Sequence, residues 1–279
     1  MRQYRAAILP GRVPVSQVDH RLDGKIPFTP SWVNVYIDFI PFWIRMVTFL
    51  LRNYRRRSFA IVGDFLVSIG GLFNFAADVY SKNLSTTKRP FYIGRPRFLS
   101  IHLLDPHLMC VPSLHVMLAV FTYVKFESIM RSFGEAEKRA LQIEEMRRGA
   151  LAICQAILFV KQHSVNCIGA SIYAMTKYDS ELFPPEKAQA ICDMLFEEYP
   201  PSPFSPVLCI RTNHDKAFCH AAKCRKCKLA VPLTKLPASD IAEIKEHITS
   251  SYRRFYNAGK TAKSWEEPLL DFLRNLPKA

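Results

Sequence analysis

The sequence predicts an all-α protein: a polytopic membrane helix bundle of about five spans, followed by a small C-terminal region. Hydrophobic residues make up 49% of the 279 residues, which excludes a disordered chain. Charged residues make up 22%, yet the mean hydropathy is +0.01, so apolar and charged residues are segregated along the chain. Apolar runs alternate with basic loops, whereas amphipathic helices of soluble proteins show a polar face.

Residues 1–30 form a basic arm that we expect to be irregular, because four prolines interrupt it. The arm has no sustained apolar core before Pro10, so it does not resemble a cleavable signal peptide. Asp38 and Arg45 interrupt the first apolar run and are expected to face the bundle interior. The last two runs are short enough that core helices of a soluble protein are an alternative. The bundle is expected over residues 31–178, with apolar runs at 32–51, 58–80, 110–126, 151–160 and 164–175.

The distribution of basic loops predicts how the bundle crosses the membrane. Residues 52–57 and 131–148 are both rich in Lys and Arg, and two apolar runs separate them. The positive-inside rule therefore places both in the cytoplasm. The loop of residues 81–109 then lies on the opposite, non-cytoplasmic face, and the chain from Lys177 onward is cytoplasmic.

The net charge of +14 and the pI near 9.5 indicate an anionic partner. Nucleic acid, a membrane surface and a phosphorylated substrate all qualify. A nucleic-acid binder gathers its basic residues on one continuous surface. Here the basic residues alternate with apolar runs, so we expect a membrane and a lipid phosphate substrate as partners, and no nucleic acid.

The stretch Cys110-Val-Pro-Ser-Leu-His115 opens the third apolar run. Pro112 suits the first turn of a helix, where its missing N–H costs nothing. The unpaired N–H groups from Ser113 onward then form a site that binds anions, phosphate above all. His115 adds a group that titrates near neutral pH. The stretch predicts a phosphate site with a proton donor, and a helix start carrying an ordinary interior histidine is the alternative.

A pair of cations precedes this stretch. If the second apolar helix runs on past Tyr80, Lys82 and Arg89 lie on one face, where an ammonium and a guanidinium make a phosphate clamp. The same spacing recurs from Lys88 to Arg95, so the register is open. We prefer Lys82 because it is closest to the end of the apolar helix. A basic loop facing lipid headgroups is the alternative.

Lys161, Gln162 and His163 form a polar break between the fourth and fifth apolar runs. Three motifs thus follow one another: Lys-(six residues)-Arg-Pro, then Pro-Ser-x-His opening a helix, then a histidine at the end of the next helix. In this order they resemble the type 2 phosphatidic acid phosphatase superfamily of membrane lipid phosphate phosphatases. The Lys-Gln-His form of the last motif is similar to the branch related to inositol-phosphoceramide synthases. The resemblance covers about residues 58–175.

The resemblance implies a role for each residue. His163 would attack the phosphorus and form a phosphohistidine. His115 would protonate the leaving alkoxide and later activate water. Lys82, Arg89 and Ser113 would hold the phosphate oxygens and stabilise the charge of the transition state. The implied protein is an integral membrane lipid phosphate phosphatase or headgroup transferase, with its active site on the non-cytoplasmic face and no metal needed for catalysis.

The sequence departs from the family pattern at two positions. Ile157 stands where the family has an arginine, and Cys167 stands where an aspartate orients the nucleophilic histidine. Lys161 is a candidate for the missing charge, and Asn166 lies one residue, about 100° round a helix, from the place of the aspartate. Loss of an orienting residue slows catalysis by orders of magnitude. A degenerate member that binds anionic lipid or a partner without turnover is therefore the alternative.

The C-terminal region, residues 179–279, carries a cluster of cysteines. Cys224 and Cys227 have the two-residue spacing of a zinc knuckle, and Cys209 and Cys219 supply two more ligands for a structural zinc. Free thiols in a reducing cytoplasm are the alternative. Nearby ligand candidates are His214 and His220. Amphipathic helices are expected over residues 239–256 and 264–276.

Overall fold

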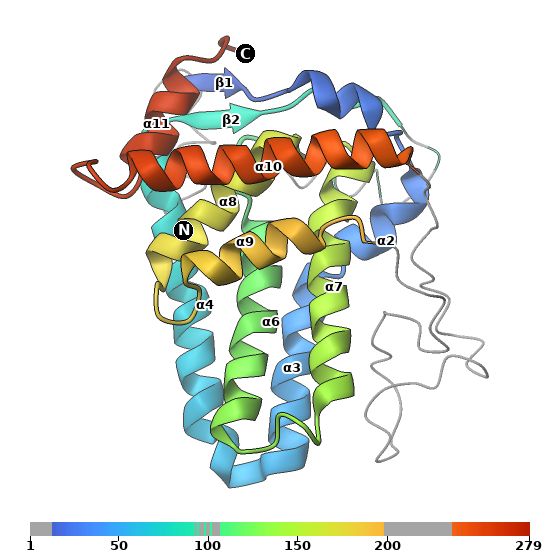
Figure 1. The fold of residues 1–279 in the computed structure, drawn as a ribbon, viewed down its shortest axis with the longest axis vertical. Helices are drawn as coiled ribbons and strands as arrows, with labels where there is room; N and C mark the ends of the chain where they lie inside the picture. Colours follow the sequence, from blue (N-terminus) through green and yellow to red (C-terminus); the bar gives the residue numbers. More distant parts are fainter. Residues whose placement is uncertain (1–12, 93, 95–97, 99–100, 102–106, 198–235) are drawn as a thin grey trace.

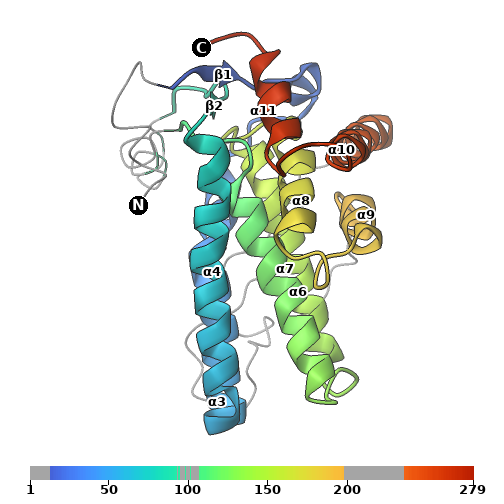
Figure 2. The ribbon, with the colours of Figure 1, turned by 90° about the vertical axis from the view of Figure 1, so that its left-hand side faces the viewer.

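The computed structural model describes residues 13–92, 94, 98, 101, 107–197 and 236–279, and in these residues the chain is mostly helical, as predicted. The helices stack in three layers, seen edge-on in Figure 2. The first layer is α3 (Phe39–Tyr54) with α4 (Phe59–Tyr80); the middle layer is α6 (Leu114–Ser132), α7 (Ala140–Phe159) and α8 (Val165–Tyr178); the last is α9 (Pro185–Met194) with α10 (Ala238–Ala258).

Two antiparallel hairpins, α3–α4 and α6–α7, run side by side along the long axis (Figure 1). Their tips adjoin at one end: the Tyr54 hydroxyl donates to Glu135 at 2.6 Å, and the Arg57 guanidinium lies 4.3 Å from the centre of the Phe133 ring. The basic junction of residues 52–57 and the start of the basic stretch 131–148 therefore share one end of the bundle, as the charge pattern predicts.

The buried charges of α3 lie as the sequence predicts. The guanidinium of Arg45 forms a two-pronged hydrogen bond with the carboxylate of Asp38, and both side chains are largely buried. A buried guanidinium is tolerated only when it is paired in this way.

The expected five membrane spans are not found in the described residues. By length and composition one helical segment, Pro30–Tyr80, is apolar enough to cross a bilayer, and 28% of its most apolar window is buried. By contrast, α8 is buried over nearly its whole length, as is the second half of α7. Other parts of the chain therefore cover these two elements, which agrees with the core-helix alternative, and the five-span bundle stays a prediction.

The first described strand and the C-terminus meet beside the end of the bundle at which α6 begins. β1 (Val15–Gln17) pairs in parallel with β2 (Leu84–Thr86), so the arm expected to be irregular contains a strand at this point. The N–H of Gln17 donates to the Pro277 carbonyl at 2.8 Å, which ties the C-terminus to the same strand. Between β1 and the bundle lies a short 3-10 helix, η1 (Arg21–Lys25).

The position of the C-terminal helices differs from the one that the sequence predicts. α10 and α11 (Glu267–Arg274) form as predicted, but they cover the end of the bundle at which α6 begins (Figure 1). Gly169 of α8 lies so close to α10 that a Cβ there would stand 2.9 Å from the Ile248 carbonyl oxygen. The membrane was expected to separate this region from the loop of residues 81–109. The structure places both at one end.

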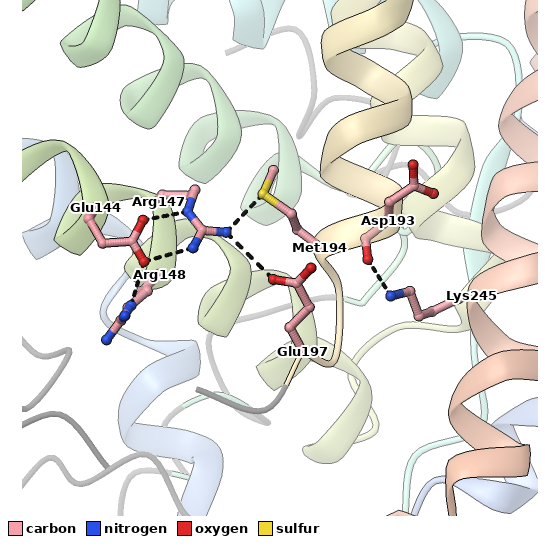
Figure 3. Close-up of polar contacts among 7 residues, drawn as sticks. All are labelled: Glu144, Arg147, Arg148, Asp193, Met194, Glu197 and Lys245. Carbon is pink, nitrogen blue, oxygen red and sulfur yellow. Dashed lines mark hydrogen bonds and ion pairs between the residues drawn. The ribbon is translucent and has the colours of Figure 1, made fainter. Parts of the chain in front are cut away.

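Polar contacts hold α9 between α7 and α10 (Figure 3). Arg147 pairs with Glu144 at 2.7 Å and reaches the sulfur of Met194 at 2.8 Å and Glu197 at 3.8 Å. On the other side, Lys245 of α10 donates to the Asp193 carbonyl. The face of the bundle that carries α9 is therefore rich in charge.

Candidate active site

The site forms where α6 begins. A cis peptide joins Val111 to Pro112, and α6 starts at Leu114 rather than at Pro112, with Ser113 as its N-cap. Ser113 is fully buried, and its N–H donates to the Ser171 hydroxyl at 2.7 Å. That N–H is thus occupied, and the anion-binding groups of this helix end are the N–H groups of the first turn that follow it.

His163 lies in the break between α7 and α8. Lys161 adopts a left-handed conformation (φ 54°), which ends α7 and turns the chain so that the imidazole points back toward Ser113. The hydroxyl oxygen of Ser113 lies 3.4 Å from Nε2 of His163. His163 is 8% exposed, and burial lowers its pKa to about 4; the Cys110 backbone opposes this shift and Arg89 adds to it. At neutral pH the ring is uncharged, so a lone pair is available for attack.

His115, on the first turn of α6, faces His163. Their ring centroids are 5.6 Å apart with the planes at 65°. The other side of the His115 ring is held by aromatic side chains from the start of the first layer: Tyr36 of α2 (Val33–Tyr36) at 4.4 Å and Phe39 of α3 at 4.2 Å. The two histidines are near enough to contact the same tetrahedral anion.

Of the two predicted cations, Arg89 reaches the site and Lys82 does not. Arg89 donates to the side-chain oxygen of Gln162 at 3.2 Å, next to His163. α4 ends at Tyr80, so the predicted helical register of Lys82 and Arg89 is wrong; the Lys82 ammonium instead pairs with Glu266 at 2.6 Å.

The alternative pair, Lys88 with Arg95, cannot be compared as a whole with Lys82 and Arg89. Lys88 is exposed, with its N–H bonded to the carboxylate of Asp19, and Arg95 lies outside the described residues. Arg89 is therefore the described cation of this site.

The two substitutes proposed for missing family residues point elsewhere. The Lys161 ammonium donates to the carbonyls of Asp23 and Ile26, so it anchors η1 and supplies no charge to the phosphate site. The Asn166 amide donates to the Val18 carbonyl at 3.1 Å and its oxygen contacts His247 of α10 at 2.8 Å. Asn166 therefore does not orient His163.

The two departures themselves are buried. Ile157 and Cys167 are both fully buried, and burial raises the pKa of the Cys167 thiol well above its usual range. Nδ1 of His163 has no hydrogen-bond partner of good geometry among the described residues, although the Cys110 backbone lies near enough to affect its pKa. The position for which the resemblance implies an orienting carboxylate thus carries a buried, uncharged thiol.

The sequence did not predict two residues of this site, Gln162 and His107. Gln162 holds Arg89, and His107 lies 6.5 Å from His163 between ring centroids, with its Nε2 2.8 Å from the Thr87 hydroxyl. His107 is buried in a left-handed conformation (φ 53°). No local sequence pattern marks His107, because its partner Thr87 lies 20 residues earlier, just after β2.

The proposed zinc ligands Cys209, Cys219, Cys224 and Cys227 lie outside the described residues. Within the described ranges, no three His, Cys, Asp or Glu side chains are grouped to hold a metal ion. The described cysteines, Cys110, Cys154, Cys167 and Cys192, are buried free thiols.

Comparisons of the chain with models of protein families, with curated proteins and with solved structures found no match. The chemistry of the site is therefore argued from its own residues.

Proposed function

We propose that this protein is a membrane-associated enzyme that removes the phosphoryl group of a lipid phosphate through a phosphohistidine at His163. One observation carries the proposal: segments far apart in the sequence bring His115 and His163 to a ring separation of 5.6 Å. Ser113 and Arg89 lie beside them, one by a contact with His163 and the other through Gln162. A nucleophile, a proton donor and anion-binding groups are the parts that such a transfer requires.

The reaction takes two displacements. Nε2 of the uncharged His163 attacks the phosphorus, the bond from phosphorus to the lipid oxygen breaks, and His115 gives a proton to the leaving alkoxide. Burial, with His163 adding to it, holds the pKa of His115 well below its usual range, so His115 carries this proton only when the bound phosphate, whose negative charge favours the imidazolium, lies beside it. Water then attacks the phosphohistidine, His115 takes the proton of the water, and the phosphorus–nitrogen bond breaks. Arg89 and the free N–H groups at the start of α6 stabilise the equatorial oxygens in both steps.

A lipid is the proposed substrate because the chain carries both an apolar segment able to enter a membrane and a net charge of +14. Pro30–Tyr80, which contains the first two of the five spans expected from the sequence, is the segment that supports membrane contact in the described residues. The sidedness of the site stays a prediction.

The test is phosphate release by the purified full chain in detergent micelles. The substrates are phosphatidic acid and an isoprenyl diphosphate, and the variants are His163→Ala, His115→Ala and, as a matched control on exposed α10 surface, Ser239→Ala. We expect the control to keep full activity, and each histidine variant to lose activity by a factor of about 100 or more. Acid-labile phosphate on the peptide that contains His163, found by mass spectrometry, identifies the intermediate. Activity that survives in both histidine variants contradicts the proposal.

Binding without turnover is the second candidate, and it is favoured because Nδ1 of His163 has no hydrogen-bond partner among the described residues. Cys167→Asp separates the two candidates. A rise in phosphate release indicates an enzyme weakened by the loss of its orienting carboxylate. No release before or after the substitution, with unchanged binding of phosphatidic acid, indicates a binding protein.

Transfer to a lipid hydroxyl instead of water is a variant of the first candidate, because the same phosphohistidine serves both acceptors. Addition of diacylglycerol or ceramide to the assay decides between them: a new phospholipid product shows transfer, and free phosphate alone shows hydrolysis.

A further inference from the structure

The outer surface of the first layer carries exposed large apolar side chains along α3 and the first half of α4. We call it the apolar face and define it by its exposed large side chains: Ile40, Ile44, Leu51, Phe59, Leu66 and Val67. Val67 is 76% exposed and Phe59 is 60% exposed, so these side chains are not part of the hydrophobic core. Core helices of soluble proteins are mostly buried, whereas 28% of the most apolar window of Pro30–Tyr80 is buried. An exposed apolar surface of this extent marks an interaction site.

Four exposed arginines, the tip arginines, lie where α3 turns into α4: Arg52, Arg55, Arg56 and Arg57. Their place is fixed by Ser58, whose hydroxyl donates to the Leu50 carbonyl at 3.1 Å and closes the turn. The apolar face thus ends in a concentrated positive charge. Apolar side chains beside clustered arginines fit a bilayer that contains anionic lipid.

A second copy of the chain fits this surface less well than a bilayer does. Two parallel copies joined through the apolar face would bring the tip arginines of both together, and like charges at an interface are unfavourable.

The neighbouring hairpin, α6–α7, determines how α3 and α4 are oriented relative to the bilayer. The tips of α3–α4 and α6–α7 adjoin, so a bilayer crossed by the first hairpin would also surround the second. At that depth the second hairpin carries Glu127, paired with Lys187 of α9 at 3.3 Å, and Glu144, paired with Arg147 at 2.7 Å. Ionised groups are expensive in the hydrocarbon core, so this bundle is unsuited to stand across a membrane.

The polar residues of α4 agree with a shallow position. Asp64 and Asn74 are exposed on this helix, and at headgroup depth both keep contact with water. α4 has 22 residues and is about 33 Å long, which lets it extend along the surface beside α3.

We propose that the protein binds an anionic bilayer through the apolar face and the tip arginines, with α3 and α4 parallel to the membrane plane. This arrangement serves the site, because α3 begins and α4 ends beside it: Phe39 packs on His115, and the Tyr80 hydroxyl donates to the Pro112 carbonyl. The surface that carries lipid headgroups then reaches the site from the side. The proposal concerns attachment alone and holds whether or not His163 turns over substrate.

The first test is co-sedimentation of the full chain with vesicles of phosphatidylcholine containing about one third phosphatidylglycerol. We expect Leu66→Glu combined with Val67→Glu to weaken binding about tenfold or more. Arg56→Ser should weaken it about fivefold at low salt and less at high salt. Ala242→Glu on the exposed side of α10 is the matched control and should bind like the parent chain.

Two results overturn this part of the proposal. One is binding that the double substitution leaves unchanged, with melting temperatures equal to that of the parent chain. The other is a stable dimer in analytical ultracentrifugation that the double substitution dissociates, without binding to vesicles, which assigns the face to a second copy.

The second test separates a position along the membrane from a crossing. Arg56→Cys at the tip and Ser239→Cys on α10 are each labelled, in sealed vesicles, with a maleimide that cannot cross the bilayer, and the labelled peptides are identified by mass spectrometry. The proposal expects both positions to react from the same side. Reaction from opposite sides shows that the α3–α4 hairpin crosses the bilayer and overturns it.

Discussion

The two outer layers of the molecule differ in what they present to the surroundings, yet each contacts one half of the same site. The α3–α4 layer is apolar on its outer side, and its start holds His115 between Tyr36 and Phe39. The α9–α10 layer has a polar outer side, and His247 of α10 contacts Asn166, three residues after His163. α8 and the second half of α7, in the middle layer, are buried.

This difference shows which interactions fix each histidine. The aromatic rings around His115 need no partner charges, because burial of apolar area holds them together. On the α10 side, Asn166, three residues after His163, is bonded to the Val18 carbonyl and to His247, and each lost hydrogen bond leaves a buried polar group unsatisfied. The α10 side of the site is therefore the more sensitive to substitution and to pH.

The largest expected effect comes from separating α10 from the middle layer. In Gly169→Val the Cβ would stand 2.9 Å from the Ile248 carbonyl oxygen and 3.1 Å from the Tyr252 nitrogen, and backbone cannot yield cheaply. We expect the free energy of unfolding to fall by about 3 kcal/mol, measured by urea titration.

Gly70→Ala on α4 is the matched control for this substitution. Nothing lies within 4 Å of a Cβ at Gly70, and the position is exposed in mid-helix, so alanine should stabilise the protein by about 0.5–1 kcal/mol. If Gly70→Ala changes the free energy of unfolding by the same amount and in the same direction as Gly169→Val, the view that α10 packs on α8 while the outer side of α4 faces no protein is contradicted.

An intermediate effect is expected from pH. Burial, together with the neighbouring His20, Arg254 and Arg21, lowers the pKa of His247 to about 4. Between pH 6.5 and 4 the unfolded chain binds a proton here that the folded protein excludes, so stability falls as the pH falls through this window.

His247→Gln tests this origin of the pH dependence. Glutamine can still donate to Asn166 but does not titrate, so we expect the stability loss between pH 7 and 4.5 to shrink by about 1–2 kcal/mol, with allowance for the partly exposed ring. The stacked ring of His20, 3.9 Å away, supplies part of the remaining slope because burial lowers its pKa as well. An unchanged pH profile would show that another group governs the acid side.

What the sequence could predict is what spacing and local chemistry determine. The helices over residues 239–256 and 264–276, the break at Lys161, the shared end of the two basic junctions and the inward position of Asp38 and Arg45 all follow from patterns a few residues long. The proximity of His115, His163 and Ser113 followed from the order of motifs, because each sits at a helix end and the helices alternate in direction.

What the sequence could not predict depends on contacts across long separations. Apolar runs alone do not distinguish a helix that faces lipid from one buried by protein, so α8 was expected as a span although α10 covers it. The helix ends at Tyr80 and β2 follows, so Lys82 leaves the predicted helical register. Its ammonium pairs with Glu266, which lies 184 residues away in the sequence. His107 enters the site through a left-handed backbone that no local pattern marks.

The smallest expected effect sharpens the boundary between the site and the polar side. Lys82 is half-exposed and pairs with Glu266, so Lys82→Ala should cost at most about 1 kcal/mol of stability. Because its ammonium is directed to Glu266 and not to the histidines, phosphate release and protection by vanadate against heat should stay within about twofold of the parent chain. Arg89→Ala, the paired comparison, should weaken vanadate protection about tenfold, since Arg89 borders His163 through Gln162. If the two variants lose vanadate protection equally, Lys82 leaves Glu266 when the anion binds, and both cations predicted from the sequence hold the anion in the occupied site.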